Sequence, residues 1–312
     1  MRGVGVIEFG GPEALQVVDL PEVHAGSGEV RLRVHAATVN PTDTFTRGGA
    51  RAEALLKYPP PYIPGMDAAG VVDEIGPGTS TELALGDAVM AMVIPNGSHG
   101  AYRESIVLKA GAVARAPAGS SHAEASTLPM NGLTARLSLD QLALEPGQTI
   151  AVTGAAGCYG GYVVQLAKAD GLRVIADASS ADEQLVRDLG ADIVVPRGDD
   201  IAEQIRKVAA DGVDALADGA VQDDLAVGAI KDGGGFAAVR GWRGNGERDI
   251  VFHVTMVVNY DQRADLLDQL RQQTEDGKIS LRVAATYDPE DAAESHRRLA
   301  TGGTRGRCVI TF

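Results

Sequence analysis

Hydrophobic and polar positions alternate along the first part of the chain. Six short runs rich in β-branched residues are separated by Gly, Pro or Asp, and this pattern is typical of strands. The predicted strands cover residues 4–9, 15–20, 29–39, 68–76, 87–93 and 101–108. The first part of the chain is therefore expected to be rich in β-structure.

From about residue 123 the pattern becomes an alternation of strand-like and helical segments. Strands are predicted at 149–154, 172–178, 192–196 and 213–219, with helices at 160–171, 182–190 and 201–210 between them. Such alternation predicts a parallel sheet with helices on both faces. After about residue 254 two helices, at 262–277 and 289–302, alternate with strands at 280–287 and 307–312.

These patterns predict an α/β protein of two domains. A doubly wound parallel-sheet domain is expected at residues 123–253, where dinucleotide-binding units have this layout. The flanking segments, 1–122 and 254–312, are expected to form one discontinuous, β-rich domain. A chain of 312 residues is long enough to bury two cores of this size.

Composition and charge narrow the possible partners. The formal net charge is −14 and no Lys/Arg cluster is visible, which argues against nucleic acid or an anionic membrane surface. The two cysteines, Cys158 and Cys308, do not suggest a disulfide framework. Without a long apolar run or a basic-apolar leader, we expect a cytoplasmic protein.

A glycine-rich turn is the clearest functional signal. The segment "AVTGAAGCYGG", residues 151–161, places Gly154, Gly157 and Gly160 between a predicted strand and a predicted helix. In that context Gly157 would let the backbone approach a pyrophosphate, and Gly160 would let helix and strand pack closely. Unpaired N–H groups at the helix start favour an anion. The alternative is an ordinary tight turn.

The end of the second predicted strand bears on the choice of dinucleotide. Asp177 would bond an NAD ribose only if it faced that ribose, and Ala178 beside it points to the opposite side. Ser179 and Ser180 are short donors suited to the 2′-phosphate of NADP. We therefore predict NADPH in preference to NADH.

Two further interpretations of this stretch remain open. Ser180 also begins a capping-box pattern with Glu183, so its role could be that of a helix cap. Arg187 or Arg197 could add positive charge near a 2′-phosphate, although both are residue types common on solvated surfaces.

The ordered motifs resemble a known family over essentially the whole chain. The sequence is similar to the zinc-independent quinone oxidoreductases, the zeta-crystallin-like branch of the medium-chain dehydrogenase/reductase superfamily. The similarity rests on "VHAATVNPTDTFTRGG", "YIPGMDAAGVVDEIGPG", "LPMNGLTAR", "VTGAAGCYGGYVVQLAK" and "GGTRGRCVI". It implies a GroES-like catalytic domain for 1–122 with 254–312, and a Rossmann domain for 123–253.

The zinc ligands of that superfamily are absent from their places. Zinc-dependent members carry Cys and His where this chain has Asn40 and Met66, and they carry a four-cysteine lobe that is missing here. Zinc needs three or four N, S or O ligands, and the six scattered histidines offer no ligand spacing. We predict no metal. Hydride addition to a quinone or enone gives a delocalised anion, for which hydrogen bonds and positioning suffice.

The resemblance implies catalytic roles for Asn40, Phe45 and Arg47. Asn40 is expected beside the nicotinamide, facing a cleft, so that its removal should affect folding little; the alternative is an Asn-Pro turn. Asp43 and Arg47 are spaced as an i,i+4 pair on a short helix. Phe45 replaces a frequent Tyr and cannot donate a hydrogen bond; Tyr58 or Tyr62 could substitute for it.

The predicted cofactor contacts extend along the strand ends of the Rossmann domain. They are Asn40, Thr134, Ala156, Gly157, Cys158, Tyr159, Gly160, Ser179, Ser180, Arg197, Gly219, Ala220, Val239, Arg240 and Gly241. Cys158, at a helix start, is either oxidation-sensitive or simply small enough for the turn. The segment "VRGW", 239–242, is bulkier than in relatives, which leaves the shape of the substrate pocket open.

The sequence thus predicts an NADPH-dependent reductase of quinones or other conjugated carbonyls. An enoyl reductase acting on acyl thioesters is the enzymatic alternative, and a non-catalytic nucleotide-binding or RNA-binding relative is the alternative of another class. The expected partners are a small-molecule substrate and a second copy of the chain. The resemblance implies a homodimer that pairs through a sheet edge of the nucleotide-binding domain, and the apolar run 249–258 is the expected edge, because an exposed strand of this kind otherwise invites aggregation.

Overall fold

The computed structural model describes residues 1–312 as two compact units. Unit 1 comprises Met1–Met130, Tyr260–Glu275 and Leu281–Phe312, and unit 2 comprises Asn131–Asn259 with Asp276–Ser280. The domain boundaries that we expected, after residue 122 and after residue 253, stay a prediction. No helix is both long enough and apolar enough to cross a membrane.

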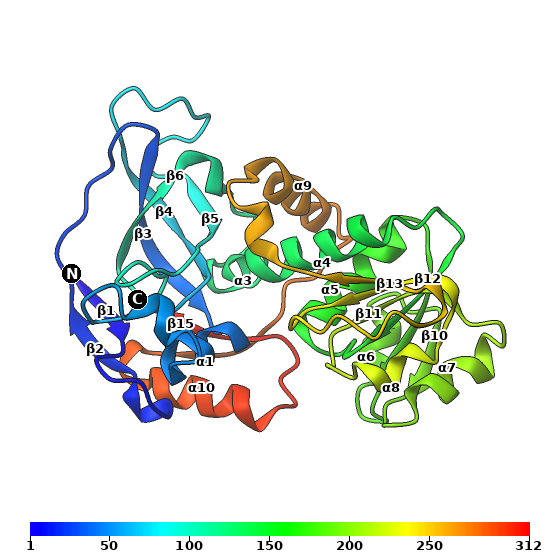
Figure 1. Cartoon of the computed structure of the whole chain (residues 1–312). Coiled ribbons are helices and arrows are strands. Elements are labelled where there is room, and N and C mark those ends of the chain that lie inside the picture. The colour runs from blue at the N-terminus through cyan, green and yellow to red at the C-terminus, as the bar shows by residue number, and fades with distance from the viewer. The chain divides into compact units, whose positions relative to one another are not determined.

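Unit 1 is built on a seven-stranded sheet and a separate β1–β2 hairpin (Figure 1). The sheet order is β14-β15-β3-β4-β5-β7, with β6 also paired to β3; only β14 and β15 pair in parallel. The strands are β1 (Arg2–Gly5), β2 (Gln16–Asp19), β3 (Glu29–Thr38), β4 (Asp67–Ile75), β5 (Ala88–Met92), β6 (Ser105–Lys109), β7 (Val113–Arg115), β14 (Val283–Tyr287) and β15 (Arg307–Thr311).

Alternation along β3 explains how this sheet forms its core. Val30, Leu32 and Val34 are buried, whereas the arginines between them are half-buried or exposed, as expected for a strand with one apolar face. The helices of unit 1 are α1 (Pro41–Gly48), α2 (Ala52–Leu55), α3 (His122–Ser126), α9 (Ala264–Glu275) and α10 (Ala292–Thr301); α4 (Pro129–Leu142) begins in unit 1 and continues in unit 2.

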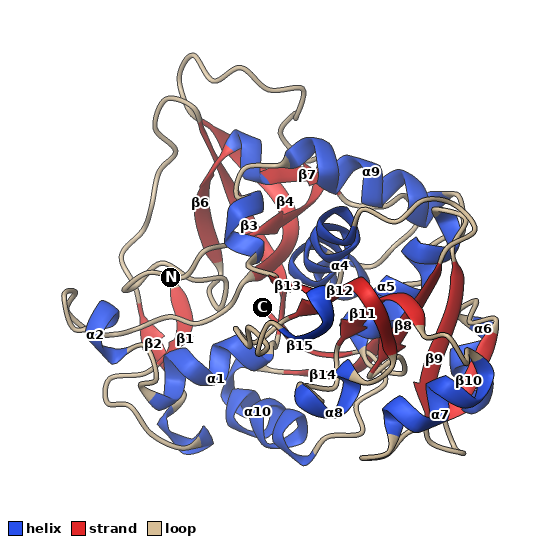
Figure 2. Cartoon of the chain, turned by 45° about the vertical axis from the view of Figure 1, so that its right-hand side comes forward, coloured by secondary structure: helices blue, strands red, loops and turns tan.

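Unit 2 is a doubly wound parallel sheet, which confirms the predicted fold class (Figure 2). Its strand order is β10-β9-β8-β11-β12-β13, and every pairing is parallel. The elements are β8 (Thr149–Thr153), α5 (Cys158–Ala169), β9 (Arg173–Ala178), α6 (Glu183–Asp188), β10 (Ile193–Pro196), α7 (Ile201–Val208), β11 (Val213–Asp218), α8 (Asp224–Val227), β12 (Ile230–Ala238) and β13 (Val251–Val254).

The position of β8 matters most for function. The chain leaves β8 toward β9 on one side and later returns to place β11 on the other side. The carboxyl ends of β8 and β11 therefore form the topological switch point, where open α/β sheets bind their ligands. Apolar residues of α7 and α8 pack with β8, β9 and β11 in one core.

The structure differs from the predicted elements where packing overrides local pattern. Strand β12 begins at Ile230, before the glycines at 233–235, although glycine disfavours strands. A Cβ on Gly234 would lie 2.6 Å from the backbone oxygen Asp214 O of strand β11, so this close approach of the two strands requires glycine. The predicted strand at 101–108 is shorter, because β6 begins at Ser105.

A chain of buried polar side chains joins α1 to α10 inside unit 1. Asp43, Tyr102 and His296 are at most 1% exposed. The Tyr102 hydroxyl donates to Asp43 Oδ2 at 3.0 Å and lies 3.3 Å from His296 Nε2, while Arg47 Nη1 lies 3.3 Å from His296 Nδ1. Because Arg47 can only donate, His296 accepts at Nδ1 and donates from Nε2.

This network corrects the predicted i,i+4 pair between Asp43 and Arg47. Asp43 instead accepts from the N–H groups of Asn40 (2.7 Å) and Gly65 (3.0 Å) as well as from Tyr102. Burial raises the pKa of Asp43 to about 6, although these donors oppose the shift. Asp43 and Arg47 do lie four residues apart on one helix, but the Asp43 carboxylate bonds buried N–H and O–H donors instead of the half-buried Arg47 guanidinium.

His296 should give the protein a specific acid sensitivity. Burial, and then the charge of Arg47, lower the pKa of His296 to about 3, against about 6.5 in an unfolded chain. The unfolded state therefore takes up a proton that the folded state refuses, so this contribution to stability is complete above pH 6.5 and declines as the pH falls toward 3.

We expect His296→Gln to remove this contribution. Between pH 7.5 and pH 5, the wild type should lose about 2 kcal/mol of unfolding free energy relative to the variant, as one differential proton allows. Comparing the two proteins cancels the opposite pH dependence of Asp43. Urea denaturation at both pH values measures the difference, with His24→Gln, at an exposed histidine, as the control. A constant difference across this range would show that His296 takes up its proton as readily in the folded as in the unfolded state.

Candidate functional site

The glycine-rich turn lies between β8 and α5, at the carboxyl edge of the parallel sheet. Gly154 has φ +66°, and a Cβ there would lie 2.8 Å from the carbonyl carbon of Gly219. A Cβ on Gly160 would lie 2.4 Å from Gly154 O, so helix and strand meet more closely than any other residue allows. Gly157 is the N-cap of α5. The turn thus has the glycines and the helix N-terminus that a pyrophosphate requires.

Asp177, at the end of β9, turns its carboxylate into this turn. Its Oδ1 accepts from the N–H of Ala155 at 3.1 Å, and its side chain is buried. Burial raises the pKa of Asp177, whereas the backbone donors and the charge of Arg197 lower it. The acid that could have bonded a ribose therefore braces the turn from within.

The residues that follow β9 differ from the helix-cap interpretation. Helix α6 begins at Glu183 with Asp182 as its N-cap, so the capping box that we considered for Ser180 is wrong. Ser179 donates to Asp182 Oδ2 at 2.7 Å, and Ser180 is exposed. Asp182, and not Ser180, is therefore the residue that precedes the first turn of α6.

The two candidate arginines are separated by the structure. Arg187 forms an exposed pair with Glu183, four residues earlier on α6. Arg197 follows β10, its N–H bonds Ala178 O at 3.0 Å, and its side chain is exposed. Arg197, not Arg187, therefore lies beside the end of β9.

The other predicted contacts of unit 2 follow β11 and β12. Gly219 and Ala220 lie against the end of β8, with Gly219 N donating to Thr153 O and Ala220 N to Thr153 Oγ1, both at 3.1 Å. Arg240 and Gly241 are exposed after β12. Trp242 instead packs its indole against Phe236 and Phe252, with centroid distances of 4.8 and 5.2 Å. The largest side chain of "VRGW", Trp242, thus packs against the core of unit 2.

Three predicted contacts have roles inside unit 2. Cys158 is 4% exposed, so a thiol at this helix start is shielded from oxidants. The Tyr159 hydroxyl lies 2.7 Å from Ser138 Oγ, and Thr134 is largely buried on α4. Burial raises the pKa of Tyr159. The burial of Cys158 agrees with a small residue that fits the turn, and the cofactor contacts of Thr134 and Tyr159 stay predictions.

Asn40 is held by a second buried carboxylate. Its Nδ2 donates to Asp67 Oδ2 at 2.6 Å, and Asp67 Oδ1 accepts from the N–H of Met130 at 2.6 Å. Asn40 is 0% exposed, and its place beside the nicotinamide stays a prediction. Burial raises the pKa of Asp67 to about 7, while its donors and the charge of Arg307 oppose this shift. The sequence offered no signal for this pairing, because the partners are 27 residues apart.

The remaining aromatic candidates of unit 1 differ in exposure. Phe45, on α1, is 37% exposed. Tyr62 is buried, stacks on Phe9 with a centroid distance of 5.1 Å and donates to Tyr58 O. Tyr58 is 41% exposed, and its hydroxyl accepts from Asn96 Nδ2 at 2.9 Å. Phe45 and Tyr58 are therefore the two aromatic side chains available to a ligand.

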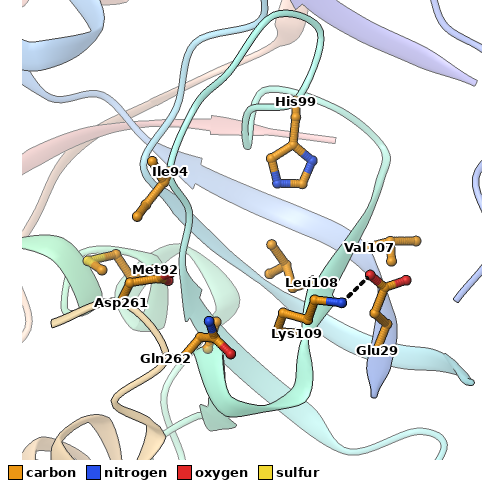
Figure 3. Close-up of a pocket in the computed structure, with 10 residues that line it drawn as sticks. Glu29, Met92, Ile94, His99, Val107, Leu108, Lys109, Asp261 and Gln262 are labelled. Carbon is orange, nitrogen blue, oxygen red and sulfur yellow. Dashed lines mark hydrogen bonds and ion pairs between the residues drawn. The ribbon is translucent and has the colours of Figure 1, made fainter. Parts of the chain in front are cut away.

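Unit 1 also contains a cavity of about 220 Å³ (Figure 3). Its lining includes the ion pair of Glu29 with Lys109, at 2.9 Å, together with His99 and Met92. None of the residues predicted for the site lines it. No group of three or more His, Cys, Asp or Glu side chains in the structure is arranged to hold a metal ion.

Comparisons with known proteins agree with this architecture. The family described as "Alcohol dehydrogenase GroES-like domain" matches residues 26–129, and "Zinc-binding dehydrogenase" matches residues 189–310. Quinone oxidoreductase of Rattus norvegicus is 29% identical over 99% of this chain and 97% of its own length. The 2-methylene-furan-3-one reductase of Solanum lycopersicum is 27% identical over 99% of this chain and 79% of its own length.

Solved structures match over the whole chain. An NAD-dependent alcohol dehydrogenase is 30% identical with a TM-score of 0.89, and each chain is covered completely. The mycobacterial protein Rv1454c, solved in complex with NADPH, is 26% identical with a TM-score of 0.85, again with complete coverage of both chains. These matches show that the chain belongs to the medium-chain dehydrogenase/reductase superfamily and is similar over its whole length to quinone oxidoreductases.

Proposed function

We propose that this protein is an NADPH-dependent reductase that transfers hydride to a quinone or another conjugated carbonyl without a metal. The turn between β8 and α5 is the observation that carries the proposal. Its close backbone contacts leave no room for side chains, and its helix N-terminus favours an anion. The names of the quinone oxidoreductase and enone reductase relatives support the same substrate class.

The geometry at the end of β9 supports NADPH over NADH. The two solved relatives differ in their named cofactors, so likeness alone does not decide. Asp177 is 3% exposed and its Oδ1 is bonded to Ala155 N, so little of this carboxylate is open to a ribose hydroxyl. Ser180 and Arg197, both exposed, offer a hydroxyl and a cationic donor at this edge, which suit a 2′-phosphate, whereas the hydroxyl of Ser179 already donates to Asp182.

The side chains at the zinc-ligand positions favour metal-free chemistry. Asn40 donates to a carboxylate, and Met66 Sδ accepts from the Thr42 hydroxyl at 3.2 Å, so both are engaged inside unit 1. A carboxamide and a thioether are poor zinc ligands. A conjugated carbonyl suits such a site, because the charge that develops on its oxygen is delocalised.

The catalytic roles that we propose follow from these positions. Bound NADPH supplies the hydride. Asn40 orients the nicotinamide or donates to the substrate oxygen, with its carboxamide fixed by Asp67. Phe45 presents an exposed aromatic face, and Arg47 adds positive charge on the same helix while bonded to His296. Thr134, Ala156, Gly157, Gly219 and Arg240 remain proposed cofactor contacts.

The purified protein should oxidise NADPH in the presence of a quinone, and NADPH should bind more tightly than NADH. The expected cause is the engaged Asp177 and the donors around Arg197. Loss of nicotinamide absorbance with quinones, enones and acyl thioesters tests the reaction, and calorimetry compares the cofactors.

Exhaustive chelation should leave the rate unchanged. Turnover confined to acyl thioesters would identify an enoyl reductase, and a need for zinc would contradict the metal-free mechanism.

Asn40→Ala should lower kcat roughly 10- to 1000-fold, with the loss of one oriented donor as the upper guide. It should also cost about 1–3 kcal/mol of stability, because Asp67 loses a donor while buried. Steady-state kinetics and urea denaturation measure the two effects. Thr38→Val, which removes a buried hydroxyl bonded to Ser126 O, is the matched control and should lower stability without changing kcat. An unchanged kcat in Asn40→Ala would leave Asn40 with a structural role alone.

A dimer through unit 2 is the assembly that we propose. Strand β13 is an edge of the parallel sheet, with β12 as its single neighbour. Val251, Met256 and Val258 in and after it are 52%, 48% and 38% exposed. An uncovered apolar edge is a liability that pairing removes.

Light scattering at micromolar concentration should therefore give the mass of two chains. Val251→Lys should shift this mass toward one chain, because it places a charge on the paired edge. Leu85→Lys, at an exposed leucine of unit 1, is the control. A wild-type mass of one chain would refute the dimer.

A further inference from the structure

The loop that follows β11 is held in a strained conformation. Val221 has φ +58° and Asp223 has φ +48°, whereas positive φ is uncommon outside glycine and exceptional for a β-branched residue. Backbone strain of this kind persists only when surrounding bonds fix it, and it concentrates at ligand-binding segments. The loop 219–223 lies at the carboxyl end of the sheet, directly beside the glycine-rich turn.

Asp218 provides the bonds that fix this loop. It is the last residue of β11 and is 1% exposed. Its Oδ1 accepts from Thr153 Oγ1 at 2.5 Å, and its Oδ2 accepts from the N–H of Asp223 at 2.8 Å. Thr153 Oγ1 accepts in turn from Ala220 N at 3.1 Å. One buried carboxylate thus ties the end of β8 to both ends of the loop.

The loop and the glycine-rich turn cannot move independently. A Cβ on Gly219 would lie 2.7 Å from Thr153 O, and a Cβ on Gly154 would lie 2.8 Å from the carbonyl carbon of Gly219. Within the same loop, Gln222 Oε1 is buried without a hydrogen-bond partner. A buried acceptor of this kind is unfavourable until a donor reaches it, and amide groups of a ligand are such donors.

We propose that Asp218 is a positioning residue for the cofactor, which holds the loop 219–223 in its strained form against the phosphate-binding turn. The inference rests on the proposed function, because it takes the dinucleotide as the ligand. Asp218 lies beneath the backbone and does not touch the cofactor. It acts through Thr153 and the N–H of Asp223, so that the backbone of Gly219 and Ala220 is in place before NADPH arrives.

Calorimetric titration with NADPH tests this role without turnover. Asp218→Asn and Thr153→Val should each raise the Kd for NADPH about tenfold, because Asp218→Asn leaves one acceptor where two are used and Thr153→Val removes the hydroxyl that links Asp218 to Ala220. Thr153→Ser keeps the hydroxyl and should bind NADPH within twofold of the wild type. Thr153→Val is nearly isosteric, so it tests the proposal even if Asp218→Asn fails to fold.

Asp214→Asn is the matched control for a general loss of stability. Asp214 lies on the same strand at its amino end, and it accepts from Thr149 N at 2.7 Å and pairs with Lys231. This variant should lower stability in urea without weakening NADPH binding. Wild-type affinity in both Asp218→Asn and Thr153→Val would overturn the positioning role alone. A wild type that binds NADPH but reduces no acceptor would contradict the proposed reaction and leave the positioning role intact, and a wild type that binds no NADPH would overturn both.

Discussion

A carboxylate that leaves water must find donors within the protein, and this requirement shapes both units. Unpaired, such a group is costly; paired with N–H and O–H groups, it becomes a fixed point to which distant segments are attached. Asp218 and Asp177 attach loops of unit 2 to the glycine-rich turn. In unit 1, Asp43 and Asp67 do the same for the start of α1 and the start of α4. The segments that carry candidate function are therefore the ones that buried acids hold.

Burial raises the pKa of both Asp43 and Asp67 in unit 1, but the two carboxylates have different hydrogen-bond donors. Asp43 accepts from three donors, and its pKa is raised to about 6. Asp67 accepts from two donors near the charge of Asp43, and its pKa is raised to about 7. Arg307 lowers the pKa of both from the C-terminal strand β15. Charged groups of α1, β4 and β15 thus act together around Asn40.

Local pattern was sufficient for most of the fold. Alternation in β3 and the strand-helix rhythm from β8 to β11 reflect burial that each segment imposes on its own residues, so the sequence predicted them closely. Strand β12 had no clear local signal, because glycine disfavours strands and the need for Gly234 appears only when Asp214 O of strand β11 lies against it. The short helix α3 and the start of α4 lacked a periodic apolar signal.

For the candidate site, the sequence predicted the place and missed the bonds. The glycine turn was recognisable because its spacing carries the geometry within eleven residues. The partners of Asn40, Asp177 and Asp218 lie 27, 22 and 65 residues away, at distances that no local pattern encodes. The error on the Asp43–Arg47 pair has the same origin, because Asp43 accepts from the distant Gly65 and Tyr102, whereas the error on Ser180 concerned only where helix α6 begins.

The packing of Trp242 has an optical consequence. It is the only tryptophan of the chain, and Phe236 and Phe252 hold its indole within unit 2, just after the segment 239–241 at the end of β12. Its emission therefore comes from one defined place, beside a strand end of the nucleotide-binding fold. The molecule contains its own fluorescent reporter for this unit, one that no tyrosine or added label needs to supplement.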